Sequence, residues 1–126
     1  MRVLLDTHIL LWWLADDSLL PLQAAAAIAD GETDVLVSAA SAWEISIKQA
    51  AGRLAAPDDL LDALAANDFG ALAITADHAL GAVRLPPHHS DPFDRMLIAQ
   101  ARAESLTLVS VDSRFSYYEV DLLPLS

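Results

Sequence analysis

The chain has no cysteine among its 126 residues. Disulfide bonds, zinc sites built from thiolates and a thiol nucleophile are therefore excluded. Because disulfides belong mainly to oxidising compartments, a chain without them suits a reducing environment. We expect a cytoplasmic protein.

Long hydrophobic runs are also absent. No apolar run reaches the roughly 18 residues of a membrane-spanning helix, and the acidic Asp6 comes too early for a secretory signal. We therefore expect no contact with a membrane. The hydrophobic share of 55% is enough for one buried core, and 126 residues are too few for two ordinary domains. The sequence predicts a single domain over residues 1–126.

Basic residues are scarce. Seven Lys and Arg residues stand against eighteen Asp and Glu residues, and the net charge is −11. Nucleic-acid binders are usually basic, because phosphate contacts supply much of their affinity. Two interpretations stay open. The chain is either a non-catalytic acidic domain that binds a basic protein partner, or its acids hold divalent cations that meet phosphates.

Apolar segments of strand length alternate with segments of helical spacing. We expect strands at residues 3–5, 35–37, 72–74, 108–109 and 120–123. We expect helices at 9–15, 22–29, 57–66, 77–83 and 94–104, and one more that Ser41 caps and Gly52 ends. Such alternation predicts an α/β fold with a parallel sheet covered by helices on both faces.

Four acids fall where these elements meet. Asp6 follows the first strand and Asp112 follows the fourth, while Glu44 and Asp94 lie near the starts of two helices. In an open α/β sheet, ligands bind at the carboxyl ends of the strands. Converging carboxylates repel one another unless a cation is present, and hard divalent cations prefer oxygen ligands. With no cysteine and no convincing histidine set, Mg²⁺ or Mn²⁺ fits better than Zn²⁺.

Histidine ligands and other phosphate chemistries fit the sequence less well. His88 and His89 follow two prolines, and we expect both in a surface loop rather than at a metal. A phosphatase with an aspartyl nucleophile requires an acid two residues after Asp6, where His8 stands. A receiver-type signalling domain requires a late lysine, and none follows Lys48. Eighteen acids also place a few at strand ends by chance.

Four short sequence motifs are more specific than the positions of the acids alone. Four blocks occur in order: Leu4 to His8, Ser41 to Ile45 with Lys48 and Gly52 to Leu54, Asp91 to Ala101, and Leu108 to Asp112. Together they resemble the PIN-domain ribonucleases, and the match looks closest to the VapC toxins of bacterial toxin–antitoxin pairs. The resemblance covers nearly the whole chain.

This resemblance implies a three-layer α/β/α PIN-like domain with a five-stranded parallel sheet. It also implies a metal-dependent endoribonuclease that uses Mg²⁺, with Mn²⁺ as a substitute, and leaves 5′-phosphate and 3′-hydroxyl ends. Asp6, Glu44 and Asp94 correspond to the family's three main acidic positions and Asp112 to a fourth. Asp94 is preferred to Asp91 because it directly precedes the run Arg-Met-Leu-Ile-Ala.

Partners are implied in the same way: an RNA substrate, a homodimer, and a cognate antitoxin whose C-terminal segment covers the site. Thr7 or Ser110 is expected to orient a water. Arg95 is the candidate for a contact with an RNA phosphate or an antitoxin carboxylate. Lys48 either makes a simple pair with Glu44 or helps to hold the site. For the tryptophans, interface and core positions both stay open: Trp12, Trp13 and Trp43.

Overall fold

The computed structural model describes residues 1–125, in which a parallel sheet lies between two layers of helices. Its four strands stand in the order β3-β2-β1-β4, and every neighbouring pair is parallel. The strands are β1 (Arg2–Leu5), β2 (Asp34–Ser38), β3 (Gly70–Leu72) and β4 (Thr107–Val109). The predicted α/β fold with a parallel sheet is confirmed.

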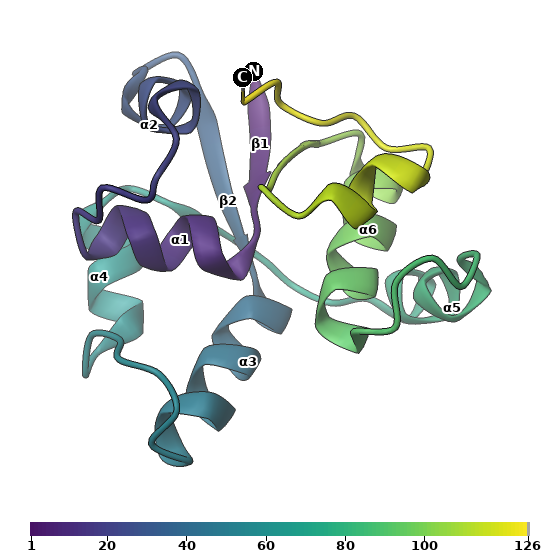
Figure 1. The fold of residues 1–126 in the computed structure, drawn as a ribbon, viewed down its shortest axis with the longest axis horizontal. Coiled ribbons are helices and arrows are strands. Elements are labelled where there is room, and N and C mark those ends of the chain that lie inside the picture. The colour runs from purple at the N-terminus through teal and green to yellow at the C-terminus, as the bar shows by residue number, and fades with distance from the viewer. Residues whose placement is uncertain (126) are drawn as a thin grey trace.

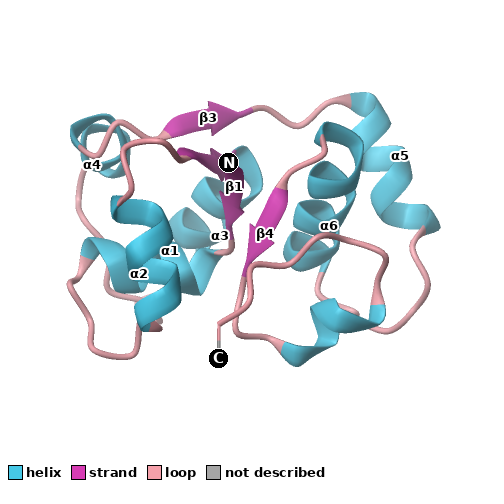
Figure 2. Cartoon of the chain, turned by 90° about the horizontal axis from the view of Figure 1, so that it is seen from above, coloured by secondary structure: helices cyan, strands magenta, loops and turns pink. Residues whose placement is uncertain are grey.

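Six α-helices and one 3₁₀ helix connect and cover these strands in the described part of the chain. They are α1 (Thr7–Leu14), α2 (Leu22–Ala29), α3 (Ala39–Ala50), α4 (Leu60–Ala66), α5 (Ala76–Arg84), α6 (Pro92–Glu104) and the 3₁₀ helix Ser113–Tyr117. Helices α1, α2 and α4 lie on one side of the sheet and α5 and α6 on the other (Figure 1). Figure 2 shows the same three layers from above.

Strand β1 shows why the sequence forms two cores. Val3, Leu4 and Leu5 are all fully buried, although successive side chains of a strand point to opposite faces. Leu4 packs in the cluster that α5 and α6 cover, whereas Val3 and Leu5 pack in the cluster on the side of α1, α2 and α4. A strand with both faces covered therefore needs an unbroken apolar run, and this run is what the sequence shows.

The prediction of a fifth strand was wrong. In place of a strand at 120–123, the structure has one isolated parallel bridge between Leu108 and Leu122. The backbone N–H of Leu123 donates to Leu108, but Pro124 follows and has no N–H group with which to extend the pairing. The sheet therefore ends at β4, with this segment alongside it.

Two element boundaries differ from those expected. Helix α3 is capped by Ser38, whose side chain accepts from the backbone N–H of Ala40, so the predicted cap at Ser41 was wrong. Strand β3 begins at Gly70 rather than at residue 72. A Cβ atom at Gly70 would lie 2.7 Å from a methyl carbon of Leu36, so a larger residue here would require the Leu36 side chain to move.

The order of the strands defines one crevice. The chain leaves β1 for β2 and β3 on one side, and returns through α5 and α6 to β4 on the other side of β1. The carboxyl ends of β1 and β4 therefore flank a topological switch point, where ligands of open α/β sheets bind. Among residues 1–125, no helix is long and apolar enough to cross a membrane.

Candidate metal centre

The four predicted acids come from four elements that meet near this crevice. Asp6 directly follows β1 and caps α1, because its side chain accepts from the backbone N–H of Ile9 at 2.9 Å. Asp112 lies three residues after β4 and caps the 3₁₀ helix. Glu44 lies in the first half of α3 and Asp94 in the first turn of α6. Asp6 and Glu44 are each only 4% exposed, which is rare for acids without a partner.

The pKa of Asp94 indicates that the carboxylates converge. Burial is the largest cause that raises this pKa, from 3.8 to about 7, and nearby negative charges add to the rise: Asp91, Asp6, Glu44 and Asp112. Burial also raises the pKa of Asp6, with a contribution from the charge of Asp112. A bound cation would offset this repulsion and favour the ionised form of each carboxyl group.

Asp91 has a different task. Its side chain accepts from the backbone N–H groups of Phe93 at 2.8 Å and of Asp94 at 3.1 Å, and so caps α6. A carboxylate held at a helix N-terminus has a structural reason to be there. This geometry supports the preference for Asp94 over Asp91 as the ligand.

Both oxygens of Glu44 have partners. The Thr7 hydroxyl donates to Oε1 at 2.7 Å, and Lys48 Nζ pairs with Oε2 at 2.5 Å. Ser41, expected as a helix cap, is buried instead and lies 3.1 Å from the Thr7 hydroxyl. Thr7, Ser41 and Lys48 thus fix the side chain of Glu44, and Lys48 is both an i,i+4 pair and a part of the site.

Ser110 connects the acids that follow β1 and β4. A hydrogen bond from its side chain lowers the pKa of Asp6 and so opposes the effect of burial. Its Oγ also accepts from the backbone N–H of Asp112 at 3.0 Å. This places Ser110 beside two of the acids, and its role in orienting a water stays a prediction.

Asp112 is held in its ionised form by a neighbouring arginine. Hydrogen bonds and charge from Arg114 lower its pKa to about 2 and outweigh the effect of burial, which raises it. Two of these bonds come from the guanidinium, at 3.0 Å from Nε and 2.7 Å from Nη2. Asp112 therefore stays negative at any physiological pH.

Arg95 bonds to backbone carbonyls of its own chain. Its two terminal nitrogens donate to backbone carbonyls at 2.8–3.0 Å, those of Ala82, Leu85, Pro86 and His89. The guanidinium therefore joins the end of α5 and the following loop to α6. A contact with an RNA phosphate or an antitoxin carboxylate would have to compete with these bonds, and it stays a prediction.

His89 was missed. The expectation of a surface loop holds for His88, which is exposed, but His89 is only 2% exposed. Its Nε2 lies 2.9 Å from Asp94 Oδ2 and 3.4 Å from Asp112 Oδ2. The one signal in the sequence is its position two residues before the cap of α6. His8 is exposed, and His78 is buried in the capping box of α5, away from the acids.

The tryptophans occupy different environments. Trp12 and Trp13 are half-buried, and the indole N–H of Trp13 donates to Asn67 Oδ1 at 2.9 Å. Trp43 is 63% exposed and meets Phe93 edge-on, with ring centroids 5.5 Å apart. Each of these two aromatic residues directly precedes an acid of the site. A role for any of the three tryptophans in an interface stays a prediction.

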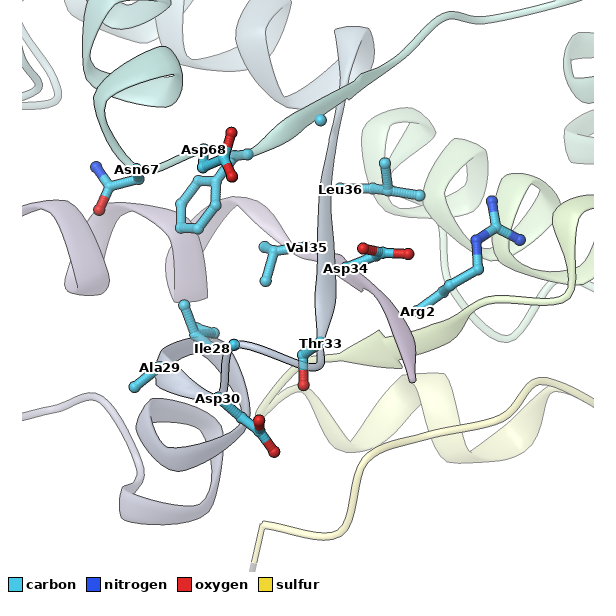
Figure 3. Close-up of a pocket in the computed structure, with 13 residues that line it drawn as sticks. Arg2, Ile28, Ala29, Asp30, Thr33, Asp34, Val35, Leu36, Asn67 and Asp68 are labelled. Atoms are coloured by element: carbon cyan, nitrogen blue, oxygen red, sulfur yellow. The ribbon is translucent and has the colours of Figure 1, made fainter.

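A separate pocket lies at the opposite edge of the sheet (Figure 3). Its lining includes Arg2 and Asp34, which begin β1 and β2, and Gly70, which begins β3. Asp30 and Asp68 add negative charge there. Because it is at the amino ends of the strands, this pocket is unrelated to the four acids.

The donor set fits a hard divalent cation. Ligand atoms of His89, Asp94 and Asp112 lie within 4.8 Å of one another, and the charges of Asp6 and Glu44 reach Asp94. Carboxylate oxygens are what Mg²⁺ and Mn²⁺ prefer. The mutual repulsion that raises the pKa of Asp94 is the unfavourable term that a cation would remove.

Comparison with known proteins gives the class. The family model described as the PIN domain matches residues 3–120. The chain belongs to the PIN domain family. More narrowly, it is related to the VapC-type ribonucleases: Ribonuclease VapC22 of Mycobacterium tuberculosis is 32% identical over 115 residues, which cover 89% of this chain and 88% of that protein.

Solved structures share the fold. VapBC2 from Rickettsia felis, bound to a DNA fragment from their promoter, has a TM-score of 0.67 and 14% identity, with 98% of each chain covered. VapC20 of Mycobacterium tuberculosis, described as a Sarcin-Ricin loop cleaving toxin, has a TM-score of 0.65 and 17% identity, with 97% of this chain and 99% of that chain covered. The predicted resemblance to PIN-domain VapC toxins is confirmed.

Proposed function

We propose that this chain is a metal-dependent endoribonuclease toxin of a toxin–antitoxin pair, which hydrolyses RNA phosphodiester bonds at a four-acid Mg²⁺ or Mn²⁺ site. The observation that carries the proposal is the pKa of Asp94, raised to about 7 by burial and by the charges around it. Strongly perturbed acids in a cleft are typical of functional sites. Here the perturbed acid lies near the switch point of the sheet.

Asp6, Glu44 and Asp94 would hold the cation, with Asp112 beside them. A bound Mg²⁺ supplies positive charge that polarises the scissile phosphate and lowers the pKa of water at the site. The protein's own contribution is orientation: Thr7 and Lys48 fix Glu44, Ser110 fixes Asp6, and Arg114 fixes Asp112. These contacts hold the carboxylates before any ligand arrives, which is the preorganisation that such catalysis requires.

The acidity of the chain limits how RNA is bound. With a net charge of −11, RNA cannot be drawn in by a broad basic surface, so the cation must supply much of the attraction to phosphate. The products are expected to carry 5′-phosphate and 3′-hydroxyl ends.

A similar structure supports an antitoxin partner. One similar structure is described as a toxin–antitoxin complex from Klebsiella pneumoniae, with a TM-score of 0.63 and 18% identity over 88% of this chain. We propose a cognate antitoxin that covers the acids, a homodimer, and a cytoplasmic location. The mass of the purified toxin in solution tests the dimer.

The test is cleavage of total RNA by protein stripped of any partner, with Mg²⁺, with Mn²⁺ and with EDTA. Asp94→Asn removes one carboxylate of the site, and Glu119→Gln, at an exposed acid, is the matched control for charge. We expect discrete cuts that need metal, vanish in Asp94→Asn and persist in Glu119→Gln. Equal inertness of all three proteins would contradict the proposal and favour a non-catalytic acidic domain that binds a basic partner. Cleavage that survived both EDTA and Asp94→Asn would also contradict it.

A further inference from the structure

His89 is held in place on every side. Its backbone N–H donates to the Tyr118 hydroxyl at 2.8 Å, and its carbonyl accepts from Arg95 Nη1 at 3.0 Å. Its ring packs against Phe115, with centroids 5.7 Å apart, and both residues are buried. The imidazole therefore has one fixed orientation.

One ring nitrogen identifies the tautomer. The backbone N–H of Asp91 donates to His89 Nδ1 at 3.2 Å, so Nδ1 is an acceptor and carries no proton. A neutral imidazole has one N–H and one acceptor, and a charged one has two N–H groups. Nε2 is therefore the ring nitrogen that carries a proton.

The protonated nitrogen faces the acids. Nε2 is 2.9 Å from Asp94 Oδ2 and 3.4 Å from Asp112 Oδ2. Neither contact has the alignment of a full hydrogen bond, and Nε2 has no aligned partner elsewhere in the described residues. Its N–H group thus lies between the two carboxylates, within reach of an oxygen from each.

These contacts distinguish two roles. His89, Asp94 and Asp112 together satisfy the spacing of a three-ligand metal site. A histidine ligand, however, must present a bare nitrogen to the metal, and its other ring nitrogen then donates a proton to a neighbouring group. Here the neighbour of Nδ1 is itself a donor, the N–H of Asp91, so Nε2 has no lone pair for a cation.

We infer that His89 is a positioning residue, which uses its Nε2–H to hold Asp94 and Asp112 together at the cation site and does not bind the cation itself. The inference rests on the proposed function only in taking these two acids as ligands. Asp91 contributes to this arrangement in two ways. Its side chain caps α6, and its backbone N–H sets the tautomer of the His89 ring.

The first test reads the tautomer directly. Two-bond ¹H–¹⁵N spectra of the full chain, with ¹⁵N-labelled histidine, separate protonated from bare ring nitrogens, and His89→Gln identifies the signals among the four histidines. We expect His89 to show a protonated Nε2 and a bare Nδ1, without Mg²⁺ and with saturating Mg²⁺. A proton on Nδ1, or loss of the Nε2 proton when Mg²⁺ is added, would overturn the inference.

A second test separates positioning from packing. Loss of partners that orient metal ligands typically weakens metal binding by about 10- to 100-fold. We expect His89→Leu to weaken Mn²⁺ binding in calorimetry by about tenfold, and His89→Gln, which keeps an N–H donor, to recover most of it. Equal losses in both folded variants would overturn the inference. If His89→Leu does not fold, the spectra of the wild-type chain still decide.

Different results would contradict the proposed nuclease activity and the proposed role of His89. Wild-type protein that binds Mn²⁺ and shows the expected tautomer, but leaves RNA uncut, would contradict the nuclease and support the role of His89. RNA cleavage with a metal-bound Nε2 would do the reverse.

Discussion

Asp94→Asn should stabilise the metal-free protein at alkaline pH, although it removes a residue of the site. The folded protein holds the Asp94 carboxyl among other carboxylates, with a pKa of about 7 in place of 3.8. An acid whose pKa is raised by folding opposes folding wherever it must ionise. Asparagine keeps the shape and an oxygen for the His89 N–H, but it carries no charge.

The size of the effect follows from the pKa. A rise from 3.8 to about 7, at about 1.36 kcal/mol per pH unit, corresponds to about 4 kcal/mol lost at pH 8. The side chain is 21% exposed, and screening by water and salt reduces the figure to about 2 kcal/mol. The loss begins above pH 3.8, grows as pH rises and levels off above pH 7. The advantage of Asp94→Asn should therefore be larger at pH 8 than at pH 5.

Urea unfolding in EDTA at pH 5 and pH 8 measures this, with Glu119→Gln as the control for loss of one exposed negative charge. Saturating Mg²⁺ should then reverse the order at pH 8, because the wild-type protein gains binding energy that the variant lacks. Asp94→Asn that is less stable than wild type at pH 8 in EDTA, or an advantage that does not change with pH, would refute the reasoning.

Three further changes test individual contacts. Arg95→Lys keeps the charge but not the planar fork that meets backbone carbonyls, so we expect a loss of about 2 kcal/mol in urea unfolding; unchanged stability would favour the phosphate-contact interpretation. Thr7→Val leaves a buried oxygen of Glu44 without its donor and should cost about 1–3 kcal/mol, whereas Thr7→Ser should stay close to wild type; equal losses would refute a role for the hydroxyl. Arg114→Ala should move the pKa of Asp112 up from about 2 toward 3.8 in an NMR titration, because the hydrogen bonds and the positive charge of the guanidinium are gone; an unchanged pKa would contradict the contact between the two side chains.

Much of the fold could be predicted because strands with two covered faces are visible as short apolar runs. Val3 to Leu5 and Val35 to Val37 are such runs, and each is part of an observed strand. The segment 120–123 has a similar composition but makes only one bridge, since its pairing depends on how Pro124 ends it. Local pattern does not carry that information.

The acids could be located because they follow strand ends and helix starts, which the sequence marks. His89 and Arg95 could not. Their roles depend on backbone groups that only the folded chain brings near: the N–H of Asp91, and the carbonyls at the end of α5 and in the loop after it. A histidine pair after two prolines is typical of a loop, and here the 3₁₀ helix with Phe115 covers one of the two.

Whether the four acids form one cation site is tested most directly by a crystal structure of the chain grown with Mn²⁺ and recorded at an X-ray wavelength where manganese scatters anomalously. The account predicts an anomalous peak among the carboxylates of Asp6, Glu44, Asp94 and Asp112, with the His89 ring outside the ligand shell. A peak bonded to His89 Nε2 would contradict the tautomer assignment. No peak at the four acids, or a peak only beside Asp30, Asp34 and Asp68 at the opposite edge of the sheet, would contradict the central claim.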